Sequence, residues 1–205
     1  GLNTPKALRK RMQEHGFSYV IFGVAFYGSS STSGPATADF LEPYIKELIR
    51  WRIRPFLMGE LFGGAAASQS QQMVNDLVEL VNDTGASGMI TRMRSVSPSN
   101  AGWTAESATS HAEHLSDASL RNNISVGLLG PGHPNQFPEL ESAINNVKGA
   151  VNYVMANIAP QPTLINPDII DMVLSEASSQ WSEFGYDAIF PVYPVYGPGF
   201  AEVPS

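Results

Sequence analysis

One carboxylate in this sequence, Glu60, lies where it could do chemistry. It stands in the phrase Met58-Gly59-Glu60-Leu61-Phe62, near the end of an apolar run that we expect to form a strand. In sheets built from strand–helix units, ligands bind at the carboxyl ends of the strands, and apolar neighbours suit a carboxyl group to general-acid catalysis. A structural alternative is that Glu60 is tied to a helix N-terminus or to an arginine such as Arg92.

Glycoside hydrolysis by such an acid requires a second carboxylate within about 5 to 10 Å. No other expected strand end supplies an obvious candidate. Glu202 follows the segment 196–199 and could reach back, although a solvated tail residue is the simpler interpretation. The sequence therefore does not complete a catalytic pair, and we leave open whether the chain is an enzyme.

Aromatic and amide side chains stand at or near the other expected strand ends. Flat apolar rings beside hydrogen-bonding groups suit sugar rings, which offer C–H faces and hydroxyl edges. The alternative is that some of these rings belong to an ordinary core or face a partner subunit. The residues that we predict to line a ligand cleft with Glu60 are Trp103, His133, Asn157, Tyr193 and Tyr196.

Several other chemistries lack support. The chain has no cysteine, which excludes disulfides and thiolate chemistry. It has no phosphate-binding glycine motif and no nucleophile-elbow serine, so we expect no cofactor and no serine-hydrolase activity. His111, His114 and Asp117 are spaced to share one helical face, but an exposed polar face explains that spacing better than a metal site, and we predict no metal.

Charge and hydropathy limit the partners. A formal net charge of −7 repels nucleic acid at long range, and no apolar run reaches the roughly 20 residues that a membrane helix needs. We therefore expect neither a nucleic-acid partner nor a membrane partner. Only 15% of the residues are charged. This suits a polysaccharide-facing or self-assembling protein better than a cytosolic enzyme, and it favours an extracellular location.

The sequence repeats one pattern along the chain: an apolar run, a loop of small residues and an amphipathic helix. Continuous apolar runs without alternation indicate strands buried on both faces, as in parallel sheets covered by helices. We therefore predict one α/β domain over residues 1–205, with residues 1–16 as an N-terminal helical arm. The sheet would form a compact or incomplete (βα) barrel, since a full eight-fold barrel takes about 250 residues, or else an open doubly wound sheet. The predicted strands begin near Phe17, Arg54, Ala86, Ile124, Val151 and Ala188.

The intervening helices have their own patterns. Phe40, Leu41, Tyr44, Ile45, Leu48 and Ile49 predict one apolar stripe, and residues 73–81 repeat the pattern. Residues 105–122 predict a helix of weak amphipathicity. Asn166-Pro167 is typical of a helix start.

The order of these phrases resembles that of the (βα)8 glycoside hydrolases, nearest to the chitinase-like family 18. Residues 56–59 and 63–64 are similar to that family's third-strand glycine phrase. Residues 131–132 and 151–155 are similar to its fifth and sixth strands, and residues 193–200 to its seventh-strand phrase. The resemblance runs from about residue 17 to residue 200 and implies a barrel fold and a polysaccharide ligand.

The same resemblance implies that hydrolysis is lost. The family's catalytic D-x-x-D-x-D-x-E run falls on residues 87–94, where Gly88 is retained and the acids are replaced by Ser87, Ile90, Arg92 and Arg94. Arginine cannot protonate a glycosidic oxygen at neutral pH. The phrases also look like β-1,3-glucanases of family 17. There Glu60 matches the acid and Asn157 a substrate-side residue, but the nucleophile falls near Tyr193.

Three hypotheses follow. The first is a carbohydrate-recognising, non-hydrolysing glycosidase-like domain. The second is a structural assembly subunit, such as a viral or phage capsid protein, since low charge and abundant Gly and Pro suit it too. The third is an active glycoside hydrolase that uses Glu60 as its general acid.

Overall fold

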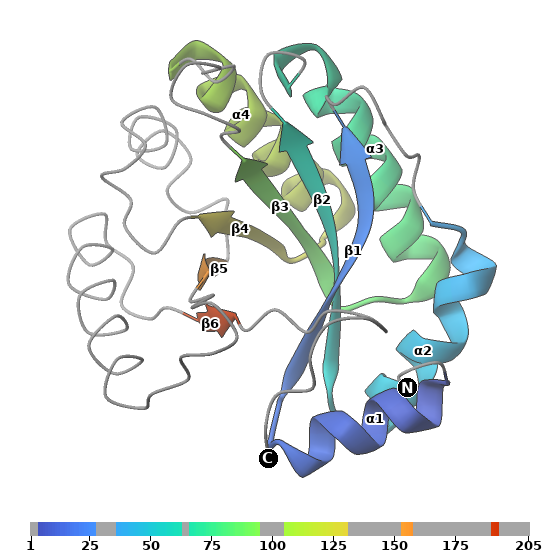
Figure 1. Ribbon diagram of the computed structural model, residues 1–205. Helices are drawn as coiled ribbons and strands as arrows, with labels where there is room; N and C mark the ends of the chain where they lie inside the picture. Colours follow the sequence, from blue (N-terminus) through green and yellow to red (C-terminus); the bar gives the residue numbers. More distant parts are fainter. Residues whose placement is uncertain are drawn as a thin grey trace, which may run out of the picture.

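The computed structural model describes residues 4–27, 36–62, 66–94, 105–130, 153–157 and 190–192 of the 205-residue chain. Within them, helices and strands alternate from the first helix to the fourth strand (Figure 1). Each of the six apolar runs contains a strand, as predicted. The elements are α1 (Pro5–Glu14), β1 (Tyr19–Tyr27), α2 (Ala38–Arg50), β2 (Arg54–Phe62), α3 (Ala66–Thr84), β3 (Gly88–Arg94), α4 (Ala105–Asn122), β4 (Val126–Gly130), β5 (Tyr153–Asn157) and β6 (Phe190–Val192).

The strands form one parallel sheet in the order in which they occur along the chain, β1 to β6. A doubly wound sheet reverses its strand order at a switch point, and this sheet does not, so that alternative is wrong. Among the described strands β1 pairs with β2 alone and β6 with β5 alone, so the sheet curls without closing (Figure 1). The prediction of repeated βα units that form one parallel sheet is confirmed.

Helix α2 buries a narrower apolar stripe than the sequence pattern suggests. Leu41, Ile45 and Leu48 of α2 are buried, whereas Phe40 is 63% exposed and Ile49 45% exposed. Apolar spacing predicts which residues can share a face, but only the neighbouring elements decide how wide the covered face is. The expected helix start at Asn166-Pro167 lies outside the described residues. No described helix is long and apolar enough to cross a membrane.

The two faces of β2 have different neighbours. A Cβ atom added at Gly59 would lie 2.6 Å from Sδ of Met73 and 3.0 Å from Cδ1 of Leu77, so α3 packs closely on this face. On the opposite face Phe56 packs with Ile90 of β3. We call the face toward α3 the helix face and the face that carries Phe56 the inner face. Because successive residues of a strand alternate between faces, Glu60 lies on the inner face.

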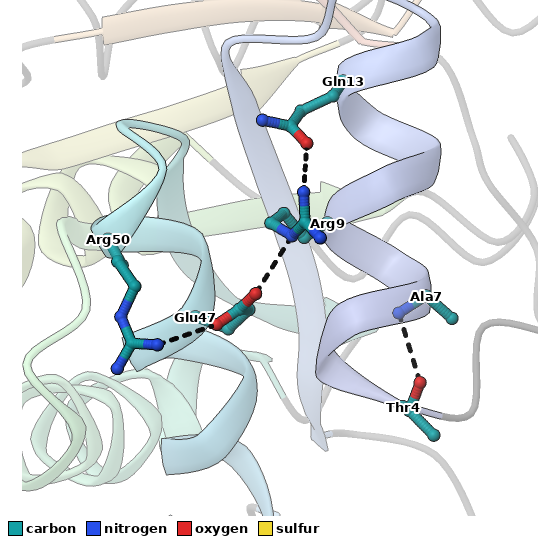
Figure 2. A network of polar contacts seen from close by, with 6 residues as sticks. All are labelled: Thr4, Ala7, Arg9, Gln13, Glu47 and Arg50. Atoms are coloured by element: carbon teal, nitrogen blue, oxygen red, sulfur yellow. Dashed lines mark hydrogen bonds and ion pairs between the residues drawn. The ribbon is translucent and has the colours of Figure 1, made fainter.

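A polar network fastens α1 to α2 at the end of the sheet where the strands begin (Figure 2). Nε of Arg9 lies 3.0 Å from Oε1 of Glu47, and Arg50 approaches the other oxygen of the same carboxylate at 3.6 Å. The Arg9 guanidinium also lies 4.4 Å from the ring centroid of Trp51. Beneath these groups Leu8 and Met12 pack with Leu48 and Ile53. The network therefore surrounds an apolar contact at the end opposite to the predicted site.

Gly88 provides a test of the strand packing. A Cβ atom there would lie 2.4 Å from the backbone oxygen of Ser125, which cannot move without disturbing β4. We expect Gly88→Ala to lower the free energy of unfolding by about 1–3 kcal/mol, as overpacking does. Urea unfolding would measure it. Gly23→Ala is the matched control, because its added methyl group meets nothing closer than 3.7 Å. Equal stability of the two variants would contradict this packing.

Candidate functional site

Glu60 lies near the carboxyl end of β2, two residues before the strand ends at Phe62. It is 4% exposed, and the parallel register places it between Phe26 of β1 and Arg92 of β3. A bulge in β1 between Gly23 and Ala25 brings Phe26 into this register. Without that shift, Ala25 would lie beside Glu60 in place of Phe26. The structure thus places Glu60 on the inner face at the strand end, where sequence reasoning expected a ligand-facing acid.

The strand register shows which residues of the other strands lie level with Glu60. Arg92 pairs with Leu129 of β4, and Leu129 pairs with Met155 of β5. Asn157, the last residue of β5, therefore lies two residues beyond the level of Glu60, at the same end of the sheet. Whether the remaining predicted ligand-binding residues join them stays a prediction, because they lie outside the described residues. These are Trp103, His133, Tyr193 and Tyr196, and the same holds for Glu202.

Glu60 is the only acidic residue on the six described strands. Strand β3, which lies directly beside it, reads Gly88–Arg94 without a carboxylate. A glycosidase that retains or inverts configuration through two carboxylates holds them about 5–10 Å apart, which adjacent strands can provide. The described strands offer Glu60 no acidic neighbour at this distance.

Tyr27, at the end of β1, fastens that strand to α3. It is 5% exposed, and its hydroxyl donates a hydrogen bond to Asp76, which also accepts one from Gln72 at 2.6 Å. Burial, together with the bond to the carboxylate and its charge, raises the pKa of the Tyr27 phenol well above its usual range. Tyr27 thus stays protonated and lies on the helix face, so it supports the site end of β1 and does not line the inner face.

The histidines of α4 have a different environment from the one expected. His111 is 1% exposed, and its Nδ1 lies 2.6 Å from Oγ of Ser70 on α3, while its Nε2 lies 3.0 Å from Oγ1 of Thr91 on β3. Nδ1 of His114 lies 2.9 Å from the same Ser70 oxygen. The expectation of an exposed polar face is therefore wrong for His111. Helical spacing marked the pair, but nothing in the sequence marked Ser70 or Thr91 as partners.

Asp117 does not join the two rings. It is exposed and binds Arg121 at 2.9 Å along α4. The part of the chain that the structure describes holds no group of three or more His, Cys, Asp or Glu residues that could bind a metal ion. The polar contacts described between α3 and α4 are the hydrogen bonds of Ser70 with the two imidazoles.

The buried imidazole predicts a pH effect on stability. Burial, and secondarily the neighbouring His114, lower the pKa of His111 from 6.5 to about 3. Between these values the unfolded chain binds a proton that the folded chain does not. The free energy of unfolding should therefore fall by about 1.4 kcal/mol per pH unit as pH drops from about 6.5 toward 3.

Urea unfolding at a series of pH values would measure this slope. His111→Gln should be less stable at neutral pH and should lose this part of the slope. His15→Gln, at an exposed histidine, is the control and should keep it. A slope that His111→Gln leaves unchanged would contradict the buried neutral imidazole.

Comparison with solved structures finds similar folds among chitinases. A chitinase from Chromobacterium violaceum ATCC 12472 superposes with a TM-score of 0.55 and 16% identity, over 85% of this chain and 61% of that chain. A GH18 chitinase from Pseudoalteromonas aurantia gives 0.56 and 14% over 87% and 73% of the two chains. The family 18 chitinase from Crocus vernus gives 0.56 and 11% over 83% and 68%.

These likenesses establish a chitinase-like (βα) fold, in agreement with the resemblance of the strand phrases. The chain spans about three fifths of the length of the Chromobacterium violaceum chitinase that it matches. No family profile matches the sequence, and neither does any curated protein.

Proposed function

We propose that this chain is a carbohydrate-recognising domain on a chitinase-like (βα) fold that does not hydrolyse its ligand. The observation that carries the proposal is the pairing of β2 with β3. Glu60 lies on the inner face beside Arg92, on a neighbouring strand that contains no carboxylate. An arginine stays protonated at neutral pH and can act neither as general acid nor as nucleophile.

The fold supports a ligand at this end of the sheet. Parallel strand–helix sheets present ligand sites at the carboxyl ends of their strands, where the peptide carbonyls and the connecting loops converge. Glu60 is buried there at 4% exposure, and Asn157 ends β5 at the same end of the sheet. A carboxylate and an amide are the acceptors and donors that bind sugar hydroxyls. Trp103, His133, Tyr193 and Tyr196 would complete the cleft.

The solved chitinases favour chitin oligosaccharides as the first ligands to test. The similarity of the strand phrases to β-1,3-glucanases of family 17 makes β-1,3-glucan oligosaccharides the second. Isothermal titration should detect binding of one of them at millimolar concentration or below, a range set by the weak affinity of small ligands. Product analysis after prolonged incubation should show no new reducing ends. Appearance of shortened oligosaccharides would overturn the non-hydrolysing part, and absence of binding to both sugars would overturn the recognition part.

Glu60→Gln tests whether the acid contributes to binding. Removing a charged hydrogen-bond acceptor costs about 1.5–3 kcal/mol, so the dissociation constant should rise roughly 10- to 100-fold. The matched control is Glu47→Gln, the same substitution in the α1–α2 network at the opposite end of the sheet, which should leave affinity unchanged. Urea unfolding of both variants would confirm that they fold. Unchanged affinity of folded Glu60→Gln would remove Glu60 from the site.

A further inference from the structure

The contacts of Ser70 determine where the protons of the α3–α4 seam lie. Its single Oγ lies within hydrogen-bond distance of Nδ1 of both His111 and His114. Two hydrogen bonds need two protons, but a serine hydroxyl supplies only one. The second must come from one of the two Nδ1 atoms. A neutral imidazole carries a proton on one ring nitrogen, so the two rings must be opposite tautomers.

From this proton count we propose that Ser70, His111, His114 and Thr91 form an acid-sensitive latch, which holds α3 and α4 together and opens when the pair takes up a second proton. Both helices follow strands whose carboxyl ends form the candidate site. Opening of the latch would therefore loosen the outer support of β2 and β3 at that end.

One added proton can be accommodated without the loss of a hydrogen bond if it lies on His114, the ring that is only partly buried. His114 then donates through Nδ1 to Ser70, and Ser70 donates to Nδ1 of His111. His111 in turn donates through Nε2 to Thr91. Each of these hydrogen bonds keeps its proton. The only change is that the order of donors and acceptors, from His114 to Thr91, becomes fixed.

A second proton has no such solution. It would make His111 a donor at both nitrogens, so two Nδ1–H groups would face one serine oxygen and the serine proton would lose its acceptor. Two positive rings would also share that oxygen, with His111 1% exposed. The low pKa of His111, about 3, expresses the same cost. Separating the helices would let water hydrate the charge.

Described carboxylates do not compensate this charge from within the core. Glu60 is the only buried one among them, and it lies on the other face of the sheet. On α3, Asp76 binds Tyr27 and Gln72, whereas Glu79 and Asp83 are exposed. Strand β3 contributes the Thr91 hydroxyl. The acidic residues of α4 are all exposed, and they are Glu106, Glu113 and Asp117.

Nitrogen-15 NMR of the histidine-labelled full chain tests the proton count. At neutral pH one of the two rings, His111 or His114, should carry a proton on Nδ1 and the other should not. Ser70→Ala should abolish this difference in Nδ1 protonation between the two rings. Ser70→Thr, which keeps the hydroxyl, should preserve it. The same Nδ1 state in both wild-type rings would overturn the proposal, as would a difference that survives in Ser70→Ala.

Hydrogen exchange tests the opening. As the pH falls from about 6.5 toward 3, the ordinary and the lowered pKa of His111, amide protection in α3 and α4 should fall about tenfold per pH unit, as uptake of one further proton requires. Unfolding of the whole chain also exposes His111, so the latch is recognised by the level of protection: amides of α1, at the other end of the sheet, should stay better protected than those of α3 and α4 at each pH. If all three helices have the same protection at each pH, the chain unfolds as a whole and there is no latch. If no helix loses protection, the second proton does not open the seam.

Discussion

The close packing of α3 on β2 at Gly59 is the constraint on which the rest of the described structure depends. The absence of a side chain there lets Met73 and Leu77 approach the strand, and this assigns one set of alternate residues to the helix face. A shift of one residue in register would exchange the two faces. Glu60 would then point into the helix layer, and Leu61 would face inward. The inner-face position of the candidate acid thus follows from a contact on the other side of the sheet.

Two of the contacts of α3 are built from different kinds of side chain. Toward β2, Met73 and Leu77 pack on Gly59 through apolar groups that carry no titratable proton. Toward α4 the contact includes Ser70 and two imidazoles, whose hydrogen bonds depend on how many protons are present. A buried polar chain is stable only when every member has a partner, so it is more specific than an apolar contact and also easier to disrupt. The stability of the contact between α3 and α4 therefore depends on pH more than that of the contact between α3 and β2.

The sequence alone was sufficient for the strands and for most of the helices, because a short continuous apolar run that small loop residues bound is typical of a strand in a covered sheet. It also placed Glu60 at a strand end, since the apolar run stops beside it. It overestimated the covered face of α2 at Phe40 and Ile49, because periodicity does not say where a neighbouring element ends. Residues such as Trp103 and Tyr193 lie outside the described residues, and their place in the cleft stays a prediction.

Composition and periodicity thus determined the local structure, which depends on interactions within a few residues or a few turns. The order of the strands, the pairing of Glu60 with Arg92, and the meeting of Ser70 with His111 were decided only by the tertiary structure. The last two contacts join residues far apart in the sequence: 32 positions separate Glu60 from Arg92, and 41 separate Ser70 from His111. No local pattern encodes such a contact, because it depends on how separate elements pack together.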